Sequence, residues 1–358
     1  MIIVVGSGII GSWIAYTLAK AGEEVYVFEK SFHAGDGISG RNSGVLHSGI
    51  YYDDTSLKSK LCFRGYEIGI PFFEKYNIPH SICGKVITTG VSVSKNDETE
   101  KIETIESLYE NGKRLGIPEI ELRKDPAKHW KHILGSHALW IPKTGIVDVS
   151  SYLKVIWYLC EEAGVVFLKN KKVIRENGCV FAVDSNTNEK EELEATQFIN
   201  AGGLYSDDLL DTSENREFEI RPNKGEYYRL KTQLPYETLV YPLPMKTSTA
   251  LGVHYTFHFG GDAYVGPNSN WANSKEDYSI QTSRSEYFNS LKNIIDFFKE
   301  DDLSEGYVGL RPRLFYKGEA IKDFVIHKES NWIHLLGIES PGLTSAPAIA
   351  EKIFGMIV

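Results

Sequence analysis

The first 29 residues carry a clear pattern of hydrophobic and polar positions. Ile2 to Val5 form a continuous apolar run, which is typical of a buried strand. The glycines of Gly6-x-Gly8-x-x-Gly11 follow, and apolar residues then recur at helical spacing until Gly22. A second apolar run, from Val25 to Phe28, ends at Glu29. The pattern therefore predicts a strand, a glycine-rich turn, a helix and a second strand.

This unit has the physical features of a dinucleotide site. The first glycine permits a tight turn, the second lets the backbone approach a pyrophosphate, and the third lets helix and strand pack closely. The N–H groups at the start of a helix attract phosphates, and an acid after the second strand can accept a ribose hydroxyl. An ordinary βαβ unit is the alternative. The expected contacts are Gly6, Ser7, Gly8, Ile9, Ile10, Gly11, Glu29 and Lys30.

Patterns farther along the chain predict a mixed α/β protein. Helical spacing occurs in residues 96–128, 149–163 and 277–299, and in the last segment, 341–358. Short strands are predicted at 165–168, 171–175, 179–183, 306–327 and 332–336. Residues 221–266 are rich in aromatic side chains and predict an antiparallel sheet interrupted by Pro242 and Pro244.

Both ends of the chain carry a strand, a glycine turn and a helix, since Leu335 to Thr344 repeats the opening order. A nucleotide-binding domain built from both ends is discontinuous, so a second domain is inserted into it. We expect a Rossmann-like α/β domain from residues 1–80, 143–215 and 315–358. An antiparallel-sheet substrate domain takes residues 81–142 and 216–314. A cleft between the two is the expected substrate site.

Composition narrows the class of protein. A chain of 358 residues exceeds what one core usually serves, and its net charge of −9 argues against nucleic acid or an anionic membrane as the main partner. Cys62, Cys83, Cys160 and Cys179 form no C-x-x-C pair and predict no metal site. Buried free thiols in a reducing, cytoplasmic compartment are expected. No apolar run reaches 18 residues, so we expect no transmembrane segment.

Two further segments suit a flat ligand. Ser39 to Tyr52 alternates small and polar residues, yet Val45, Leu46 and Ile50 are too apolar for a free surface loop. We interpret this segment as lining the cofactor. Asn200-Ala-Gly-Gly203 ends an apolar strand with small residues, which either admit a diphosphate or form a simple turn.

At these motifs the chain resembles flavoproteins of the D-amino-acid oxidase/glycine oxidase superfamily, and within it the L-2-hydroxyglutarate dehydrogenase family. The most specific strings are Arg41-Asn-Ser-Gly-Val-Leu-His-Ser-Gly-Ile-Tyr-Tyr52 and Gly337-Ile-Glu-Ser-Pro-Gly-Leu-Thr344. Others are Leu57-Lys58, Thr144-Gly-Ile-Val-Asp148, Ile199-Asn-Ala-Gly202, Leu251-Gly-Val-His254 and Val265-Gly-Pro-Asn268. The resemblance implies noncovalently bound FAD rather than NAD.

The resemblance also implies which residues hold the flavin. Arg41 to His47 line it, and the start of the last helix faces its pyrimidine end, where a helix N-terminus stabilises negative charge. The cofactor-binding residues expected beyond the opening turn are Arg41, Asn42, Ser43, Gly44, Val45, His47, Val173, Ala201, Gly202, Gly337, Glu339, Gly342, Leu343 and Thr344.

One departure from the family pattern concerns the substrate. After Gly252-Val-His254, the hydroxyglutarate enzymes carry a Thr-Arg pair, whereas this chain has Thr256-Phe257. The preceding stretch, Met245 to Ala250, also differs. If the missing arginine binds a second carboxylate, the substrate is not 2-hydroxyglutarate itself.

Arg311, in Gly309-Leu-Arg-Pro312, resembles the substrate-carboxylate clamp of the amino-acid oxidase branch. A guanidinium is permanently charged and matches a carboxylate in two-point geometry. The alternative for Arg311 is a surface position on an edge strand, a role that suits Arg313 better.

Oxidation of an alcohol carbon needs a base, and histidine suits that task. His254 is the first choice and His47 the second, although His47 can instead contact the flavin, with a covalent link as a variant. Tyr241 and Tyr255 are candidate substrate contacts or core residues. The remaining histidines considered are expected to be structural or on the surface: His80, His129, His132, His137 and His334.

The sequence thus predicts an FAD-dependent enzyme that oxidises a small carboxylate-bearing L-2-hydroxy acid to the 2-keto acid by hydride transfer to flavin N5. Oxidation of an amino acid or secondary amine is the alternative within enzymes. A flavin-binding protein without turnover is the alternative from another class, and the flavin-type strings disfavour an NAD-linked dehydrogenase. The electron acceptor is open among oxygen, a quinone and another protein.

Overall fold

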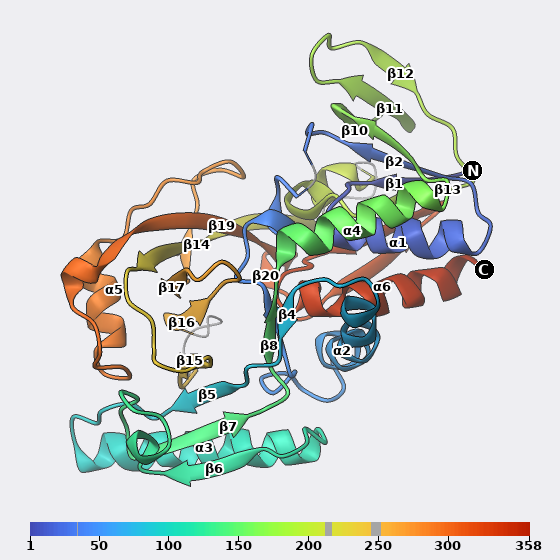
Figure 1. The fold of residues 1–358 in the computed structure, drawn as a ribbon. Coiled ribbons are helices and arrows are strands. Elements are labelled where there is room, and N and C mark those ends of the chain that lie inside the picture. Colours follow the sequence, from blue (N-terminus) through green and yellow to red (C-terminus); the bar gives the residue numbers. More distant parts are fainter. Residues whose placement is uncertain (34, 212–216, 245–251) are drawn as a thin grey trace.

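A six-stranded sheet joins strands from both ends of the chain in the computed structural model, which describes residues 1–33, 35–211, 217–244 and 252–358 (Figure 1). Its strand order is β21(Val325–Glu329), β22(Trp332–Leu336), β13(Gln197–Asn200), β1(Ile2–Val5), β2(Val25–Glu29), β9(Val166–Lys169). All neighbouring strands are parallel except β21 and β22. On β1, Val4 is paired with Val27 of β2 on one side and with Ile199 of β13 on the other.

Both faces of this sheet are covered. Helices lie on one face: α1(Ile9–Lys20), α2(Leu57–Lys75), α4(Val149–Glu162) and α6(Gly342–Ile357). On the other face, apolar residues of β1 and β2 pack with a three-stranded sheet of β10(Lys171–Glu176), β11(Cys179–Asp184) and β12(Lys190–Glu192). Because the strands are buried on both faces, they read as continuous apolar runs in the sequence.

A second, ten-stranded sheet forms the other part of the molecule (Figure 1). Its main strand order is β20(Glu319–Ala320), β19(Leu303–Tyr316), β14(Phe218–Leu230), β17(Ala263–Gly266), β16(His254–Phe257), β15(Leu239–Pro242), β5(Lys85–Thr88), β7(His137–Ile141), β6(Glu121–Lys124), and β18(Asn270–Trp271) pairs with β14. The sheet is antiparallel as predicted except for the parallel pair β5–β15. Helices α3(Lys95–Arg114) and α5(Arg284–Leu291) pack against it.

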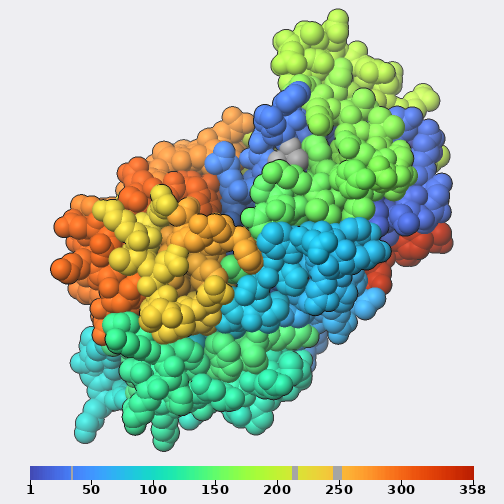
Figure 2. Space-filling model, in the orientation of Figure 1, coloured from blue at the N-terminus to red at the C-terminus, as the bar shows by residue number. Residues whose placement is uncertain are grey.

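A small sheet of β3(Val45–Leu46), β8(Gly145–Val147) and β4(His80–Ser81) completes the strands. Short 3₁₀ helices occupy Ile38–Gly40, Pro126–Lys128, Gly203–Leu209 and Glu300–Asp302. Figure 2 shows N-terminal, middle and C-terminal segments of the chain together on the side of the molecule that holds the six-stranded sheet. The 220–310 region and the α3 region form the other side.

Three expectations need correction. The helix predicted over residues 277–299 is present only as α5, because Ser283 and Glu286 form a capping box that starts the helix there. Helix α2 was not predicted. Cys62 and Cys160 are buried free thiols, whereas Cys179 is exposed.

Three other expectations concern the chain as a whole. The predicted division at residue 315 falls inside β19, which runs to Tyr316, and the split into two domains stays a proposal. No helix in the described residues is long and apolar enough to cross a membrane. In the same ranges no group of three or more potential ligands is placed to hold a metal ion.

Candidate functional site

A cavity of about 1620 Å³ lies between the two large sheets. Its walls come from the β1–α1 turn, the 35–52 segment, the end of β13, strands β14 and β19, and the loop before α6. Small-molecule sites usually measure about 300–1,000 Å³. The cavity therefore has room for a dinucleotide together with a small substrate.

The cavity gathers most of the predicted site residues. Those that line it are Gly6, Gly8, Ile9, Ile10, Glu29, Lys30, Arg41, Asn42, Ser43, Val45, His47, Val173, Ala201, Gly202, Glu339, Gly342, Leu343, Tyr241, His254 and Arg311. Ser7, Gly11, Gly44, Gly337, Thr344 and Tyr255 do not line it. Leu251, the first residue of one family-like string, and the stretch Met245 to Ala250, which differs from the family, lie outside the described residues.

The glycine turn is packed too closely to admit side chains at Gly6 and Gly11. Gly6 has φ +96°, and a Cβ there would lie 2.6 Å from the carbonyl oxygen of Ala201. A Cβ on Gly11 would lie 1.9 Å from the oxygen of Gly6, so Gly11 allows close packing rather than ligand contact. Gly8 caps α1 without any side-chain hydrogen bond. The Ile9 N–H donates to Ser39 Oγ at 3.0 Å, and the remaining N–H groups of this first turn can bind an anion.

Glu29 is held at the edge of the cavity. Its Oε2 accepts hydrogen bonds from the backbone N–H of Ser7 at 2.9 Å and from its Oγ at 2.8 Å. Its Oε1 accepts from the N–H of Ser31 at 2.9 Å. Ser7 thus orients Glu29 from behind. Beside it, the Lys30 ammonium lies 3.6 Å from the centre of the Tyr205 ring.

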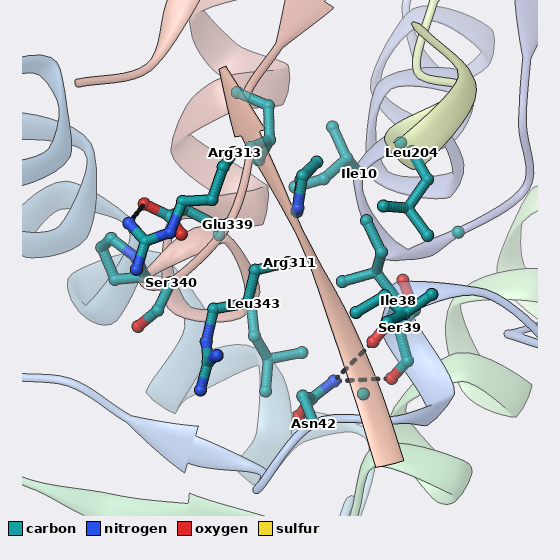
Figure 3. A pocket seen from close by; sticks show the side chains of 18 of the residues that line it. Ile10, Ile38, Ser39, Asn42, Leu204, Arg311, Arg313, Glu339, Ser340 and Leu343 are labelled. Carbon is teal, nitrogen blue, oxygen red and sulfur yellow. Dashed lines mark hydrogen bonds and ion pairs between the residues drawn. The ribbon is translucent and has the colours of Figure 1, made fainter. Parts of the chain in front are cut away.

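The 41–47 segment is anchored at both ends. Asn42 Nδ2 donates to the oxygen of Ser39 at 2.7 Å (Figure 3). Its Oδ1 accepts from Gly44 N–H at 2.8 Å. At the other end, Thr344 Oγ1 accepts from His47 N–H at 3.0 Å and donates to the Val45 oxygen at 3.4 Å. Thr344 therefore joins the start of α6 to the cavity wall from behind it.

Arg311 projects from β19 at the cavity wall and is held by three hydrogen bonds. Its Nη1 donates to Asn223 Oδ1 at 2.8 Å and to the oxygen of Lys224 at 3.3 Å. Its Nη2 donates to the oxygen of Asn268 at 3.1 Å. These acceptors carry no full charge, so the guanidinium keeps its attraction for an anion in the cavity.

His254 stacks on Tyr241, with ring centres 3.8 Å apart and planes at 16°. Its Nδ1 lies 2.8 Å from the carbonyl oxygen of Gly252. A carbonyl can only accept, so Nδ1 carries the proton and Nε2 of the neutral ring carries the lone pair. Burial, with Lys85 and Arg311 nearby, lowers the pKa of His254 to about 3.

His47 lies across from Ser340, with its Nε2 3.0 Å from the serine Oγ. Burial, together with Lys85 and His254, lowers its pKa to about 3. Both candidate bases are therefore neutral near pH 7, which is the form that can accept a proton.

The structure places Tyr255 in the core, the second of its two expected roles. Successive strand residues point to opposite faces, so Tyr255 turns away from the cavity that His254 lines. It is buried in the core behind the sheet, where its hydroxyl accepts from Leu234 N–H at 3.3 Å.

Sequence reasoning also missed charged residues in the wall. Arg313, expected on the surface, is half-buried and lines the cavity. Its Nη1 and the Nζ of Lys58 each lie 2.8 Å from Oε1 of Glu339. Figure 3 shows Arg313 and Glu339 facing each other beside Ser340. Lys58 stood within a matched string, but only the fold brings it to Glu339.

The comparisons with known proteins agree with this geometry. The family model described as "DAO: FAD dependent oxidoreductase" matches residues 1–355. The chain belongs to this family. Its cofactor is accordingly FAD, and the glycine cradle, the glycine N-cap of α1 and the size of the cavity fit that dinucleotide.

Two curated relatives are similar over nearly the whole chain. L-2-hydroxyglutarate dehydrogenase of Indibacter alkaliphilus is 30% identical, covering 98% of this chain and 97% of its own. The mitochondrial L-2-hydroxyglutarate dehydrogenase of Arabidopsis thaliana is 29% identical, covering 98% and 82%.

Solved structures share the fold. L-alpha-glycerophosphate oxidase from Mycoplasma pneumoniae with FAD bound gives a TM-score of 0.86 at 22% identity, covering 99% of this chain and 94% of that one. Glycine oxidase from Geobacillus kaustophilus gives 0.78 at 17%, covering 99% and 93%. The expected α/β architecture is thereby confirmed.

Proposed function

We propose that this protein oxidises a small L-2-hydroxy acid, of the 2-hydroxyglutarate type, to the 2-keto acid. The named activity of the curated relatives supports the substrate class. The observation that carries the proposal is the meeting of a permanent cation, Arg311, with a neutral histidine whose Nε2 carries the lone pair, His254, at one cavity.

Each residue has a distinct task in this proposal. Arg311 binds the substrate carboxylate and so orients the carbon that carries the hydroxyl. His254 accepts the hydroxyl proton at Nε2, while the Gly252 carbonyl stabilises the positive charge that develops on the ring. Tyr241 holds the imidazole plane by stacking. FAD supplies, when bound, the acceptor for the hydride that leaves the same carbon.

His47 is assigned to the flavin side of the cavity. Its backbone is tied to Thr344 and its ring to Ser340, both near the start of α6. The other lining residues named above are proposed to hold the cofactor. Ser7, Gly11, Gly44, Gly337 and Thr344 are proposed to shape the site from behind.

The proposed location is the cytoplasm, because all four cysteines are free. The small carboxylate substrate is the proposed partner, and the electron acceptor is oxygen, a quinone or a protein.

Anaerobic mixing of the FAD-loaded protein with matched acids tests the proposal. We expect L-2-hydroxyglutarate and related 2-hydroxy acids to bleach the flavin absorption band and to yield 2-keto acids. Reduction by amino acids such as glycine or sarcosine, with none by hydroxy acids, would establish the amine alternative. Reduction by neither class would leave a flavin-binding protein without this turnover.

A further inference from the structure

Lys85 is a buried cation without a counter-charge. It is the first residue of β5, its exposed fraction is 0%, and its Nζ makes no hydrogen bond within the described residues. The two other buried lysines of the described chain are paired. Lys58 bonds Glu339 at 2.8 Å, and Lys224 bonds Asp277 at 2.9 Å. A buried charge is costly unless it is paired, so the isolation of Lys85 needs a reason.

The ammonium group of Lys85 lies behind the wall of the cavity. Its Nζ is 4.5 Å from the ring centre of Tyr51 and 4.8 Å from that of Tyr241. Both tyrosines line the cavity. The parallel pairing of β5 and β15 sets Lys85 beside Leu239 and Ile87 beside Tyr241, so Lys85 and Tyr241 share a sheet face. The charge is thus next to the proposed base, on which Tyr241 stacks.

A second unpartnered group stands at the same place. The buried hydroxyl of Tyr51 has no hydrogen-bond partner in the described chain. The ammonium group lacks a counter-charge, and the hydroxyl lacks a hydrogen-bond partner, so one acidic group can satisfy both. Arg311 already supplies the anchor for one carboxylate, so this acceptor is a second acidic group at the far end of the substrate.

We propose that Lys85 is the counter-charge for a second acidic group of the substrate, acting through the wall formed by Tyr51 and Tyr241, so that the cavity selects 2-hydroxy dicarboxylates. The inference rests on the proposed function. It also bears on the missing Thr-Arg pair. Phe257 does not line the cavity, so the charge that selects a diacid need not come from that position in this chain.

The charge on Lys85 gives the proposal a pH signature. Burial lowers its pKa to about 7. The groups that face it titrate elsewhere. Burial raises the pKa of Tyr51, Tyr241 and Cys62, the pKa of His47 and of His254 is about 3, and Arg311 remains charged. Raising the pH through about 7 to 9 removes the charge on Lys85, and diacid affinity falls with it.

The test compares two acids of equal chain length, L-2-hydroxyglutarate and L-2-hydroxyvalerate, which differ at the distal group. For Lys85→Met we expect the KM for the diacid to rise about 10- to 100-fold relative to the KM for the monoacid. Lys85 also lowers the pKa of His254, so any change in kcat through that base is common to both acids. Lys143→Met is the matched control, because that ammonium also lies over two rings, Phe63 and Tyr66, but outside the cavity wall.

Wild-type protein supplies a second measurement that needs no variant. Its KM for the diacid should rise with pH while that for the monoacid stays flat. Equal losses for both acids in Lys85→Met, or parallel pH profiles in the wild type, would overturn the role of Lys85. Flavin reduction by neither acid would instead overturn the proposed function.

Discussion

At the scale of single residues, His254 is where catalysis and structure can be separated. For His254→Gln we expect kcat with a 2-hydroxy acid to fall about 10²- to 10⁴-fold, because the amide cannot take the hydroxyl proton. The FAD content and the free energy of unfolding of this variant should change little. Stopped-flow flavin reduction measures the effect.

His80 offers a matched control for that variant. Its Nδ1 also lies 2.8 Å from a carbonyl oxygen two residues earlier, that of Ile78, but it does not line the cavity. His80→Gln should therefore reduce the flavin at the wild-type rate. A wild-type rate in His254→Gln would remove the base from the mechanism and favour oxidation of a neutral amine.

Glu339 is the second residue whose role can be measured directly. It is 8% exposed and serves both Lys58 and Arg313. Glu339→Gln removes their shared carboxylate, and we expect unfolding free energy to fall by about 3–5 kcal/mol. Urea titration of the FAD-loaded protein is the measurement.

The control uses an ion pair on the surface. Glu351, 53% exposed, bonds Arg64, and Glu351→Gln should lose no more than about 1 kcal/mol. Equal losses of unfolding free energy in Glu339→Gln and Glu351→Gln would mean that the buried ion pairs stabilise the protein no more than the surface pair does.

The roles of residues could be predicted where the residues of a site are neighbours in the sequence. They could not be predicted where only the fold brings the residues together. The opening glycines and the 41–47 string were assigned to the region that lines the cavity. Arg313 was given a surface role because its partner Glu339 is 26 positions away. Tyr255 was left open between substrate contact and core residue, because a residue's face depends on strand parity, which a string match does not report. Lys85 carried no local signal at all.

At the scale of elements, the contact between α2 and α6 positions the cavity wall. A Cβ on Gly65 would lie 2.2 Å from the Thr344 oxygen and 2.8 Å from the Ser345 Cα. These are backbone atoms, so the helices must separate. We expect Gly65→Ala to lower unfolding free energy by about 1–3 kcal/mol and to weaken FAD binding, because Thr344 holds the 45–47 segment.

Gly69 lies one turn later in α2 and provides the comparison. A Cβ there would meet only the Phe73 ring, at 3.6 Å. Gly69→Ala should therefore stabilise the protein by up to about 1 kcal/mol through helix propensity. Thermal melting and FAD titration distinguish the two, and similar behaviour of both variants would show that the close approach of α2 and α6 is not limiting.

The same helix explains which elements the sequence could not predict. Gly65, Gly69 and Pro71 weaken the helical signal of residues 57–75, yet the first permits the contact that keeps α2 in place. In 277–299 the apolar spacing suggested one long helix, because Leu291, Ile294 and Ile295 are core residues. Their apolar spacing therefore reflects burial in the core and not a helix that continues through the whole segment. Strands buried on both faces were predicted correctly because their apolar runs need no partner to be recognised.

At the scale of the whole molecule, one cavity is walled by both large sheets, so the cofactor should stabilise them together. A ligand that binds only the folded state adds about 2.7 kcal/mol at 100 times its Kd. We expect FAD to raise the melting temperature of the apoprotein and to sharpen its transition. ADP carries only the adenosine diphosphate part of FAD, so we expect it to contact the β1–α1 turn and Glu29, which line the cavity, and not the wall of β14, β16 and β19. At equal saturation ADP should stabilise the six-stranded sheet and leave the larger sheet without ligand contacts. We therefore expect a broader, two-step unfolding transition in calorimetry. A single sharp transition with ADP alone would show that the two sheets are already one cooperative unit, and that the flavin end of the cavity adds no connection between them.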